Sequence, residues 1–281
     1  MNETDETHWL TVQEGDSPLL LTMPHTGTTI PSAIEEALSS GWLARKDTDW
    51  WVDRLYGFAG QIGATVVRTG ISRTVIDANR DPSGASLYPG LATTELCPST
   101  TFDGEPLNRA GRPVSAAEIE VRRREYFEPY HRAVEAQLVR LRSRHRAVVV
   151  YDCHSIRSHV PRLFDGTLPH FNLGTFNGAS CAAGLAARVE ALCDAAAAAG
   201  FSRVTNGRFK GGYTTRHYGR PGQGVHALQM ELACRGYLRE PSGALGPENW
   251  PCPYDEAFAA PLRAVLEQVL AACVTFAAEP R

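Results

Sequence analysis

The sequence predicts a single α/β domain with three layers, in which helices cover both faces of a mostly parallel or mixed central sheet. Short apolar segments with strand character alternate along the chain with segments of helical spacing, an order typical of α/β folds. The run at residues 147–151 is continuously apolar and rich in β-branched residues, as expected of a central strand buried on both faces. No repeat or low-complexity linker divides the 281 residues, so we expect residues 1–281 to form one domain.

The first half of the chain predicts short elements followed by a long loop. Pro24 ends the first apolar run, and Pro31 occupies the first turn of a helical pattern. The expected elements are strands at 19–22, 65–68 and 74–76 and helices at 31–39 and 47–58. Residues 81–113 are rich in proline, glycine, threonine and serine, which predicts a long surface loop. A loop of this length in a compact domain is usually functional or disordered.

The second half of the chain predicts longer helices. Ser115 is a good N-cap, and Glu118 three residues later completes a capping box at the start of a helix over 115–145. An alanine-rich segment predicts a closely packed helix that ends at Gly200. The other expected elements are strands at 147–151, 201–204 and 226–232, helices at 179–199 and 254–276, and loops at 155–178 and 211–219.

Composition and charge exclude several classes of protein. The formal charge is -3 and the pI is about 6.3, so no basic surface for nucleic acid is expected. Residues 1–8 are acidic and polar, so no signal peptide is expected, and no apolar run approaches the roughly 20 residues of a membrane span. The seven cysteines are scattered and form no Cys-x-x-Cys pair, which fits free thiols in the cytoplasm.

Two histidines stand where buried strands are expected to end. His25 and His154 each follow an apolar run, and the carboxyl ends of strands form the ligand-binding edge of an open α/β sheet. Two neutral imidazoles and one carboxylate can hold a divalent metal ion, with zinc the first choice. Asp49 is the first choice for the carboxylate, and Asp47 is its close rival. Because the chain has no HExxH motif, a metalloprotease site built on one helix is excluded.

Each of these residues also has a purely structural interpretation. His25 could be a loop histidine that caps a turn, and His154 could be a core histidine whose hydrogen bonds are satisfied. Asp47 or Asp49 could cap a helix, because a carboxylate is favoured at a helix N-terminus. The residue types alone leave these alternatives open.

Glu231 and a group of arginines complete the candidate site. Glu231 lies in an apolar segment, where burial would raise its pKa toward that of a general base. It could instead face solvent or pair with an arginine such as Arg80. Arginine binds a planar carboxylate through two parallel hydrogen bonds, so an anionic substrate is expected, although ordinary loop ion pairs are an alternative. The arginines expected near the rim of the site are Arg73, Arg80, Arg216 and Arg220.

Cys153 and Ser155 are the other residues that could act as a nucleophile. Adjacent residues on a strand point to opposite faces, so Cys153 is not expected to pair with His154. Ser155 lacks the Gly-x-Ser-x-Gly motif of a nucleophile elbow. These observations favour metal-assisted hydrolysis over a cysteine or serine nucleophile.

Seven short segments, in one order between about residues 19 and 240, resemble the N-formylglutamate amidohydrolase family. The first three contain Met-Pro-His25-Thr-Gly, Asp47-Thr-Asp49-Trp-Trp and Arg73-Thr-Val-Ile-Asp77-Ala-Asn79-Arg80. The other four contain Tyr-Asp152-Cys-His154-Ser, Phe-Asp165-Gly-Thr-Leu-Pro-His-Phe-Asn172, Lys210-Gly-Gly-Tyr213-Thr-Thr-Arg216-His217 and Gln229-Met-Glu231-Leu. Each segment is weak alone, and together they are specific.

The resemblance implies hydrolysis of the formyl amide of N-formyl-L-glutamate to formate and L-glutamate, the last step of one route of histidine breakdown. The family is similar in fold and site to zinc carboxypeptidases. By that analogy His25, Asp49 and His154 hold one divalent metal ion, most often Zn²⁺, and Glu231 is the catalytic base.

The same resemblance implies a substrate-binding set around the metal. Asn79 and Arg80 face the substrate, and Arg80 or Arg73 stabilises the developing oxyanion or holds the α-carboxylate. Arg216 could hold the second carboxylate, and Tyr213 lies in the same family-like segment. The expected partner is therefore a small anionic N-acyl amino acid, bound by a monomer or a small homo-oligomer.

Two other functions fit the same residues. One is a zinc deacylase or carboxypeptidase that acts on another N-acyl amino acid, and the other is a non-catalytic protein that binds a dicarboxylate. Thr74 and Ala78 stand where the family more often has tyrosine and leucine, which leaves the acyl group and the amino acid open.

Overall fold

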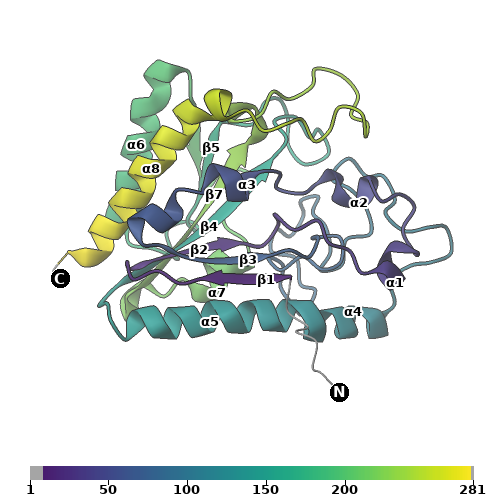
Figure 1. Cartoon of the computed structure of the whole chain (residues 1–281), viewed down its shortest axis with the longest axis horizontal. Helices are drawn as coiled ribbons and strands as arrows, with labels where there is room; N and C mark the ends of the chain where they lie inside the picture. The colour runs from purple at the N-terminus through teal and green to yellow at the C-terminus, as the bar shows by residue number, and fades with distance from the viewer. Residues whose placement is uncertain (1–8, 280–281) are drawn as a thin grey trace.

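The computed structural model describes residues 9–279 and is built on one mixed sheet (Figure 1). Its strands are Leu10–Gln13 (β1), Leu19–Met23 (β2), Thr65–Thr69 (β3), Val148–Ile156 (β4), Phe171–Gly174 (β5), Arg203–Thr205 (β6) and Val225–Ala233 (β7). Their order in the sheet is β1-β3-β2-β4-β7-β5-β6. Strands β3, β2, β4 and β7 are parallel, β1 is antiparallel to β3, and β5 is antiparallel to β7 and parallel to β6.

Helices lie on both faces of this sheet (Figure 1). The α-helices are Ser32–Glu35 (α1), Leu43–Lys46 (α2), Val52–Leu55 (α3), Ala116–Arg122 (α4), Glu128–Arg142 (α5), Ala183–Ala195 (α6), Tyr213–Tyr218 (α7) and Glu256–Ala278 (α8). The 3₁₀ segments are Ala59–Ile62 (η1), Ala196–Ala199 (η3), Pro221–Gln223 (η4) and Cys234–Gly236 (η5), and Arg123–Phe127 (η2) is a π-helix. Helices α5 and α7 pack on one face, and α6 and α8 cover the other. The predicted three-layer α/β fold is confirmed.

The central strand β4 directs alternate side chains into the two layers. All of its residues are buried. Tyr151 and Cys153 belong to the hydrophobic cluster under α6 and α8, whereas Val150 belongs to the cluster under α5. Because side chains alternate along a strand, Asp152 and His154 point to the α5 side.

Many of the predicted elements form close to their expected positions. Strands β2, β3, β4, β6 and β7 and helices α6 and α8 overlap the predicted ranges. The capping box is present, since the Glu118 backbone N–H donates to Ser115 Oγ over 3.2 Å and the Ser115 N–H donates to Glu118 Oε2 over 2.8 Å. Gly200 ends the alanine-rich helical segment with a φ of 86°. The long helix predicted over 115–145 is divided into α4 and α5 by the π-helix η2.

Other predicted elements were wrong in extent or type. No strand forms at 74–76; the chain turns there, and the Thr74 hydroxyl donates to the Ala44 carbonyl over 2.7 Å. The helix predicted over 47–58 is limited to α3, because Trp51 before it has the left-handed φ of 63°. The helix predicted over 31–39 is limited to α1.

Several elements were not predicted. Strand β1, strand β5 and helix α7 fall in segments that the sequence pattern assigned to loops or left unassigned. Strand β4 also continues to Ile156, so His154 lies inside the strand and not beyond its end. Short segments of this kind gain their hydrogen bonds from strands that are distant in the sequence, which a local pattern does not reveal.

The predicted long loop at 81–113 contains no named helix or strand, and it lies against the domain. Four apolar residues of this loop are buried: Leu96, Cys97, Phe102 and Leu107. The loop therefore forms part of the folded structure and supplies a wall of the site described below.

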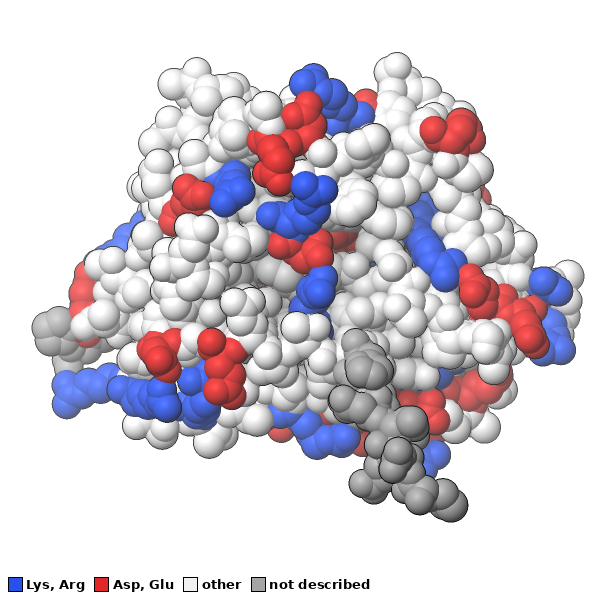
Figure 2. Space-filling view, in the orientation of Figure 1, with Lys and Arg blue, Asp and Glu red and all other residues white. Residues whose placement is uncertain are grey.

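Helix α8 is long and apolar enough to cross a membrane by length and composition alone. This corrects the expectation that no apolar run approaches that length. In that apolar stretch 33% of the residues are buried in the fold, and Leu262, Leu266 and Leu270 pack against the sheet layer. The face shown in Figure 2 carries acidic and basic side chains next to one another. The expectation about a signal peptide concerns residues 1–8, which lie outside the described residues.

Candidate active site

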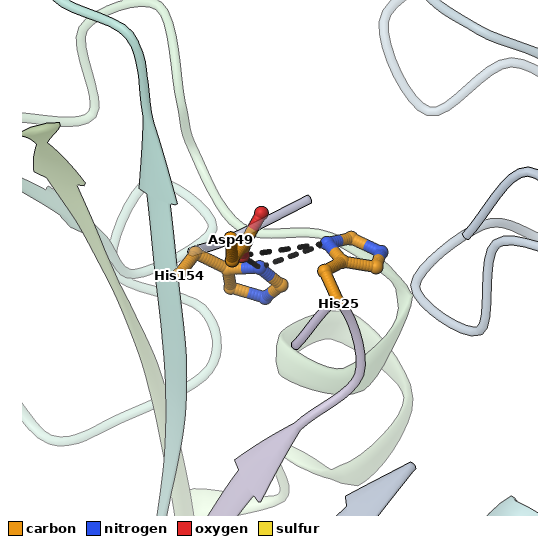
Figure 3. A group of neighbouring side chains, drawn as sticks. All are labelled: His25, Asp49 and His154. Carbon is orange, nitrogen blue, oxygen red and sulfur yellow. Dashed lines mark hydrogen bonds and ion pairs between the residues drawn. The ribbon is translucent and has the colours of Figure 1, made fainter. Parts of the chain in front are cut away.

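His25 and His154 come from neighbouring parallel strands, and their rings face each other (Figure 3). His25 follows the end of β2, and His154 lies in the C-terminal half of β4. Gly27 fixes the turn after His25, because a Cβ atom there would lie 2.3 Å from the backbone of Gly70 and Ile71. The two Nδ1 atoms are 3.1 Å apart, and both side chains are buried.

Asp49 lies in the segment before α3, and its side chain is close to both histidines. Its backbone N–H donates to the His25 carbonyl over 3.0 Å, which holds the two segments together. Asp49 Oδ2 lies 3.0 Å from His154 Nδ1 and 3.7 Å from His25 Nδ1. One atom of each residue suitable as a metal ligand lies within 4.8 Å of the others. The three side chains could therefore hold one metal ion.

Asp47, the rival carboxylate, lies outside this cluster. Its Oδ2 accepts a hydrogen bond from the Phe102 backbone N–H over 2.6 Å, and its Oδ1 accepts from Arg157 over 3.2 Å. In contrast, Asp49 Oδ1 is buried and has no hydrogen-bond partner within residues 9–279, although Arg73 Nη1 lies 3.5 Å away. Of the two aspartates, Asp49 is the one that the fold brings to the histidines.

Two further aspartates set the orientation of the imidazole rings. His25 Nε2 lies 2.6 Å from Asp77 Oδ1, and His154 Nε2 lies 2.9 Å from Asp152 Oδ2. Each carboxylate accepts a hydrogen bond from the Nε2–H of one ring, so in neutral rings both Nδ1 lone pairs point into the space next to Asp49. Two lone pairs 3.1 Å apart repel each other unless a cation lies between them. This arrangement fits a divalent metal ion.

The electrostatics of the cluster favour a positive charge at His154. Burial would raise the pKa of the Asp49 carboxyl, but hydrogen bonds from His154 and His25 outweigh it and hold the pKa below its usual range. Burial would lower the pKa of His154, but Asp152 and Asp49 raise that pKa well above its usual range. A proton and a metal ion compete for the same ring nitrogen, so a cluster that stabilises one charge also suits the other.

Glu231 lies next to this cluster on the adjacent strand β7. Its side chain is buried, and its Oε2 accepts a hydrogen bond from Gln229 Nε2 over 3.0 Å. Burial raises the pKa of Glu231 to about 7, with His154 lowering it and Asp49 raising it further. A carboxylate with this pKa can accept and return a proton near neutral pH. Neither structural alternative for Glu231 is seen: its side chain does not face solvent, and it forms no ion pair with Arg80.

His25, His154 and Glu231 line one cleft. The cleft encloses about 540 Å³ of empty space with its open mouth included. The long loop supplies one wall. The residues that line the cleft are His25, Arg73, Asn79, Arg80, Tyr88, Thr93, Thr94, Phe102, His154, Ile156, Leu163, Arg208, Phe209, Gly212, Gln229 and Glu231.

The fold brings some of the predicted substrate-binding residues to the cleft and not others. Arg73, Asn79 and Arg80 line it. Arg216 lies outside the lining; its Nε donates to the Gly211 carbonyl over 2.9 Å. Tyr213 also lies outside, with its ring against His217 and its backbone N–H bonded to the Asn79 carbonyl.

Sequence reasoning missed Asp77, Asp152 and Arg208. Asp152 lies two residues before His154, and a pair at that spacing on a strand shares one face, so a signal was present. Asp77 lies in a family-like segment but at a turn with no periodic pattern. Arg208 reaches the cleft from a loop, and no local signal identifies it.

The possible nucleophiles do not occupy a reactive position. Cys153 is fully buried in the core under α6 and α8, and burial raises the pKa of its thiol well above the usual range. The Ser155 hydroxyl accepts a hydrogen bond from Tyr237 over 2.7 Å. Neither residue lines the cleft.

Comparisons with known proteins show the family of this chain. A sequence model of the N-formylglutamate amidohydrolase family matches residues 17–238. The chain is 48% identical over 262 residues to N-formylglutamate deformylase from Pseudomonas aeruginosa, which covers 93% of this chain and 96% of that protein. It is 45% identical over 270 residues to N-formylglutamate deformylase from Pseudomonas putida, which covers 96% and 97%.

Solved structures of other proteins share the fold of this chain. The crystal structure of N-formylglutamate amidohydrolase from Ralstonia eutropha superposes with a TM-score of 0.74 at 25% identity, covering 96% of this chain and 98% of that one. A gene product from Agrobacterium tumefaciens shares the fold with a TM-score of 0.69 at 19% identity, covering 96% and 97%. The chain belongs to the N-formylglutamate amidohydrolase family.

Proposed function

We propose that this protein is a metal-dependent hydrolase that cleaves the formyl amide of N-formyl-L-glutamate to formate and L-glutamate. The deformylases to which it is similar over nearly their full length support the substrate. The observation that carries the metal dependence is the 3.1 Å approach of two histidine Nδ1 atoms beside Asp49, whose Oδ1 accepts no hydrogen bond within the described residues. The release of formate and L-glutamate fits the last step of one route of histidine breakdown in the cytoplasm, where the seven free cysteines would stay reduced.

In this proposal His25, Asp49 and His154 hold the metal ion, and zinc suits their mixed nitrogen and oxygen donors. A divalent cation there would polarise the formyl oxygen and make a water molecule a stronger nucleophile by lowering its pKa to about 7. Asp77 and Asp152 keep both rings in the tautomer that leaves Nδ1 free.

Glu231 is the proposed base. Its carboxylate takes a proton from the attacking water and later delivers a proton to the nitrogen of the leaving glutamate. Its position next to His154 and its pKa of about 7 suit both steps. Gln229 holds one carboxylate oxygen in place from the same strand.

Arg80, Arg73 and Asn79 are the proposed contacts to the polar groups of the substrate around the amide. Arg73 is held by Asp77 over 2.7 Å and Arg80 lies 3.7 Å from the same carboxyl, so both guanidinium groups are fixed beside the histidine cluster. Fixed cations stabilise the oxyanion that develops on the formyl oxygen without first having to reorient.

Hydrolysis of N-formylglutamate, N-formylaspartate and N-acetylglutamate, measured before and after chelation and zinc add-back, tests the proposal. We expect N-formylglutamate to be the fastest substrate, with activity lost on chelation and restored by zinc. A faster reaction with N-acetylglutamate would instead indicate a deacylase of another specificity. Activity that chelators leave unchanged would contradict the metal role, and metal-free protein that only binds dicarboxylates would contradict catalysis.

A further inference from the structure

The three arginines that line the cleft differ in how their charge is compensated. Arg73 forms ion pairs with Asp77 at 2.7 Å and with Asp49 at 3.5 Å. Arg80 lies 3.7 Å from Asp77. Arg208 has no carboxylate within ion-pair distance in the part of the chain that the structure describes. It is therefore the one lining cation, among residues 9–279, whose charge no acidic side chain balances.

Arg208 is held in place by contacts that leave part of its guanidinium group available. Its Nε donates to the Leu163 carbonyl over 2.7 Å, and its Nη2 donates to the Ala92 carbonyl over 2.5 Å. The guanidinium group also lies over the rings of Tyr88 and Phe209, with its Cζ 5.3 Å and 5.4 Å from the ring centroids. Within the described chain no hydrogen bond involves Nη1.

The surroundings of Arg208 favour an anion. Burial lowers the pKa of its guanidinium group, Tyr88 and Glu231 raise it, and the positive charge of Arg80 lowers it further. A partly buried cation beside a second cation is costly, and a carboxylate that pairs with it removes much of that cost. The two backbone and two aromatic contacts reduce the side-chain entropy that Arg208 would lose on binding.

We propose that Arg208 binds the side-chain carboxylate of the substrate and sets the preference for an acidic N-acyl amino acid. This inference rests on the proposed function. In N-formylglutamate the α-carboxylate is close to the scissile amide and the side-chain carboxylate is farther away. Arg80 is linked through Asp77 to His25, next to the reacting amide, whereas Arg208 has no hydrogen bond to a member of the cluster. Arg208, which lies outside the network that holds the histidine cluster, therefore suits the carboxylate that is farther from the amide.

The position of Arg216 supports this assignment. The sequence suggested Arg216 for the second carboxylate, but its guanidinium group lies between the rings of Tyr88 and Phe176, outside the cleft lining. Tyr88 contacts both arginines, and only Arg208 reaches the cleft. We therefore assign to Arg208 the carboxylate-binding role that the sequence suggested for Arg216.

The test compares two substrates of the same length, N-formyl-L-glutamate and the neutral N-formyl-L-glutamine, with the wild-type protein and Arg208→Gln. Hydrogen bonds between charged groups are about twice as strong as those between neutral groups. We therefore expect the ratio of kcat/KM for N-formylglutamate to kcat/KM for N-formylglutamine to fall by about 10- to 100-fold in Arg208→Gln. The loss should fall on N-formylglutamate, mainly in KM. Arg208→Lys keeps the positive charge but lacks the planar guanidinium group, so it should restore part of the preference for N-formylglutamate.

A matched control separates binding from loop anchoring. Arg235 also donates to a backbone carbonyl of the neighbouring loop, that of Leu168, and does not line the cleft. Arg235→Gln should leave the substrate ratio unchanged. If Arg208 only anchors loops, Arg208→Gln will lower both kcat/KM values equally and the ratio will stay at the wild-type value, which overturns the inference.

Binding separates this inference from the proposed function. Calorimetry measures the affinities of wild-type, Arg208→Gln and Arg208→Lys proteins for L-glutamate and L-glutamine. If the wild-type protein hydrolyses neither formyl substrate, the proposed function fails, and selective weakening of L-glutamate binding in Arg208→Gln still supports the assignment. Equal weakening for both amino acids, or none, overturns it whether or not the protein is an active deformylase.

Discussion

His154 and Glu231 are directly paired residues on the adjacent parallel strands β4 and β7. The register of two buried strands therefore places the proposed base beside a proposed metal ligand. Both side chains point toward the same cleft. A shift of this register by one residue would turn one of the two side chains to the opposite layer, so the core packing of β4 and β7 also preserves the chemistry of the site.

Replacement of Glu231 by glutamine tests the proposed base. Glutamine keeps the size of the side chain and its contact with Gln229 but cannot accept the proton, so we expect kcat to fall by about 10²- to 10⁴-fold. Metal content, measured by elemental analysis, should stay at the wild-type value. Glu190→Gln on α6, away from the cleft, serves as the matched control. Wild-type turnover in Glu231→Gln would remove Glu231 from this role.

A matched pair of aspartate variants tests the metal ligand. Asp49→Asn should lose the metal, because its carboxylate joins the two histidines, and activity should fall with it. Asp47→Asn should keep the metal, although it breaks a buried ion pair with Arg157 and is expected to lower stability by up to about 3–5 kcal/mol. Metal stoichiometry and denaturant unfolding measure the two effects. Metal retention in Asp49→Asn with loss in Asp47→Asn would reverse the assignment.

The histidine pair was predictable from the sequence for a clear physical reason. The apolar runs before His25 and His154 mark strands buried on both faces, and parallel neighbours end at one edge of a sheet. The sequence put Asp49 only narrowly ahead of Asp47, because their positions depend on contacts between distant segments: Asp49 N–H with the His25 carbonyl, and Asp47 with Phe102 and Arg157.

The parts of the site that come from loops were beyond sequence reasoning. Arg208 reaches the cleft because backbone carbonyls at Leu163 and Ala92, in two other loops, hold its guanidinium group. Phe102 forms a wall because its N–H is bound by Asp47. Neither contact has a periodic signal, since loops have no repeating geometry from which spatial neighbours can be inferred.

Asp152→Asn tests whether the carboxylates that bind the histidine Nε2 atoms support metal binding. Asp152 accepts hydrogen bonds from His154 Nε2 and from the Thr22 hydroxyl, which together fix the ring. The neutral amide holds the tautomer less strongly, so metal affinity should fall by about 10- to 100-fold. Competition with a chelator of known affinity measures the change, and Asp194→Asn on the surface is the control. Unchanged affinity would show that the tautomer is held by other contacts.

His131 should make the stability of the fold depend on pH. It lies on the buried face of α5, where its Nε2 donates to the Ala78 carbonyl over 2.8 Å and its Nδ1 accepts from the Tyr218 hydroxyl over 2.8 Å. Burial lowers the pKa of His131 to about 4. The unfolded chain, with a histidine pKa of about 6.5, therefore binds more protons between pH 6.5 and pH 4, and stability falls as the pH drops through this window.

The size of this effect can be measured against a variant that keeps both hydrogen bonds. A shift of this size corresponds to about 3 kcal/mol of stability lost between pH 7 and pH 4. In His131→Gln the amide can still donate to Ala78 and accept from Tyr218 but does not titrate. Urea unfolding of the metal-free proteins at pH 7 and pH 4 should show a wild-type loss about 3 kcal/mol larger than that of the variant. Equal losses in the two proteins would mean that other groups set the acid sensitivity, since each other titrating group is common to both.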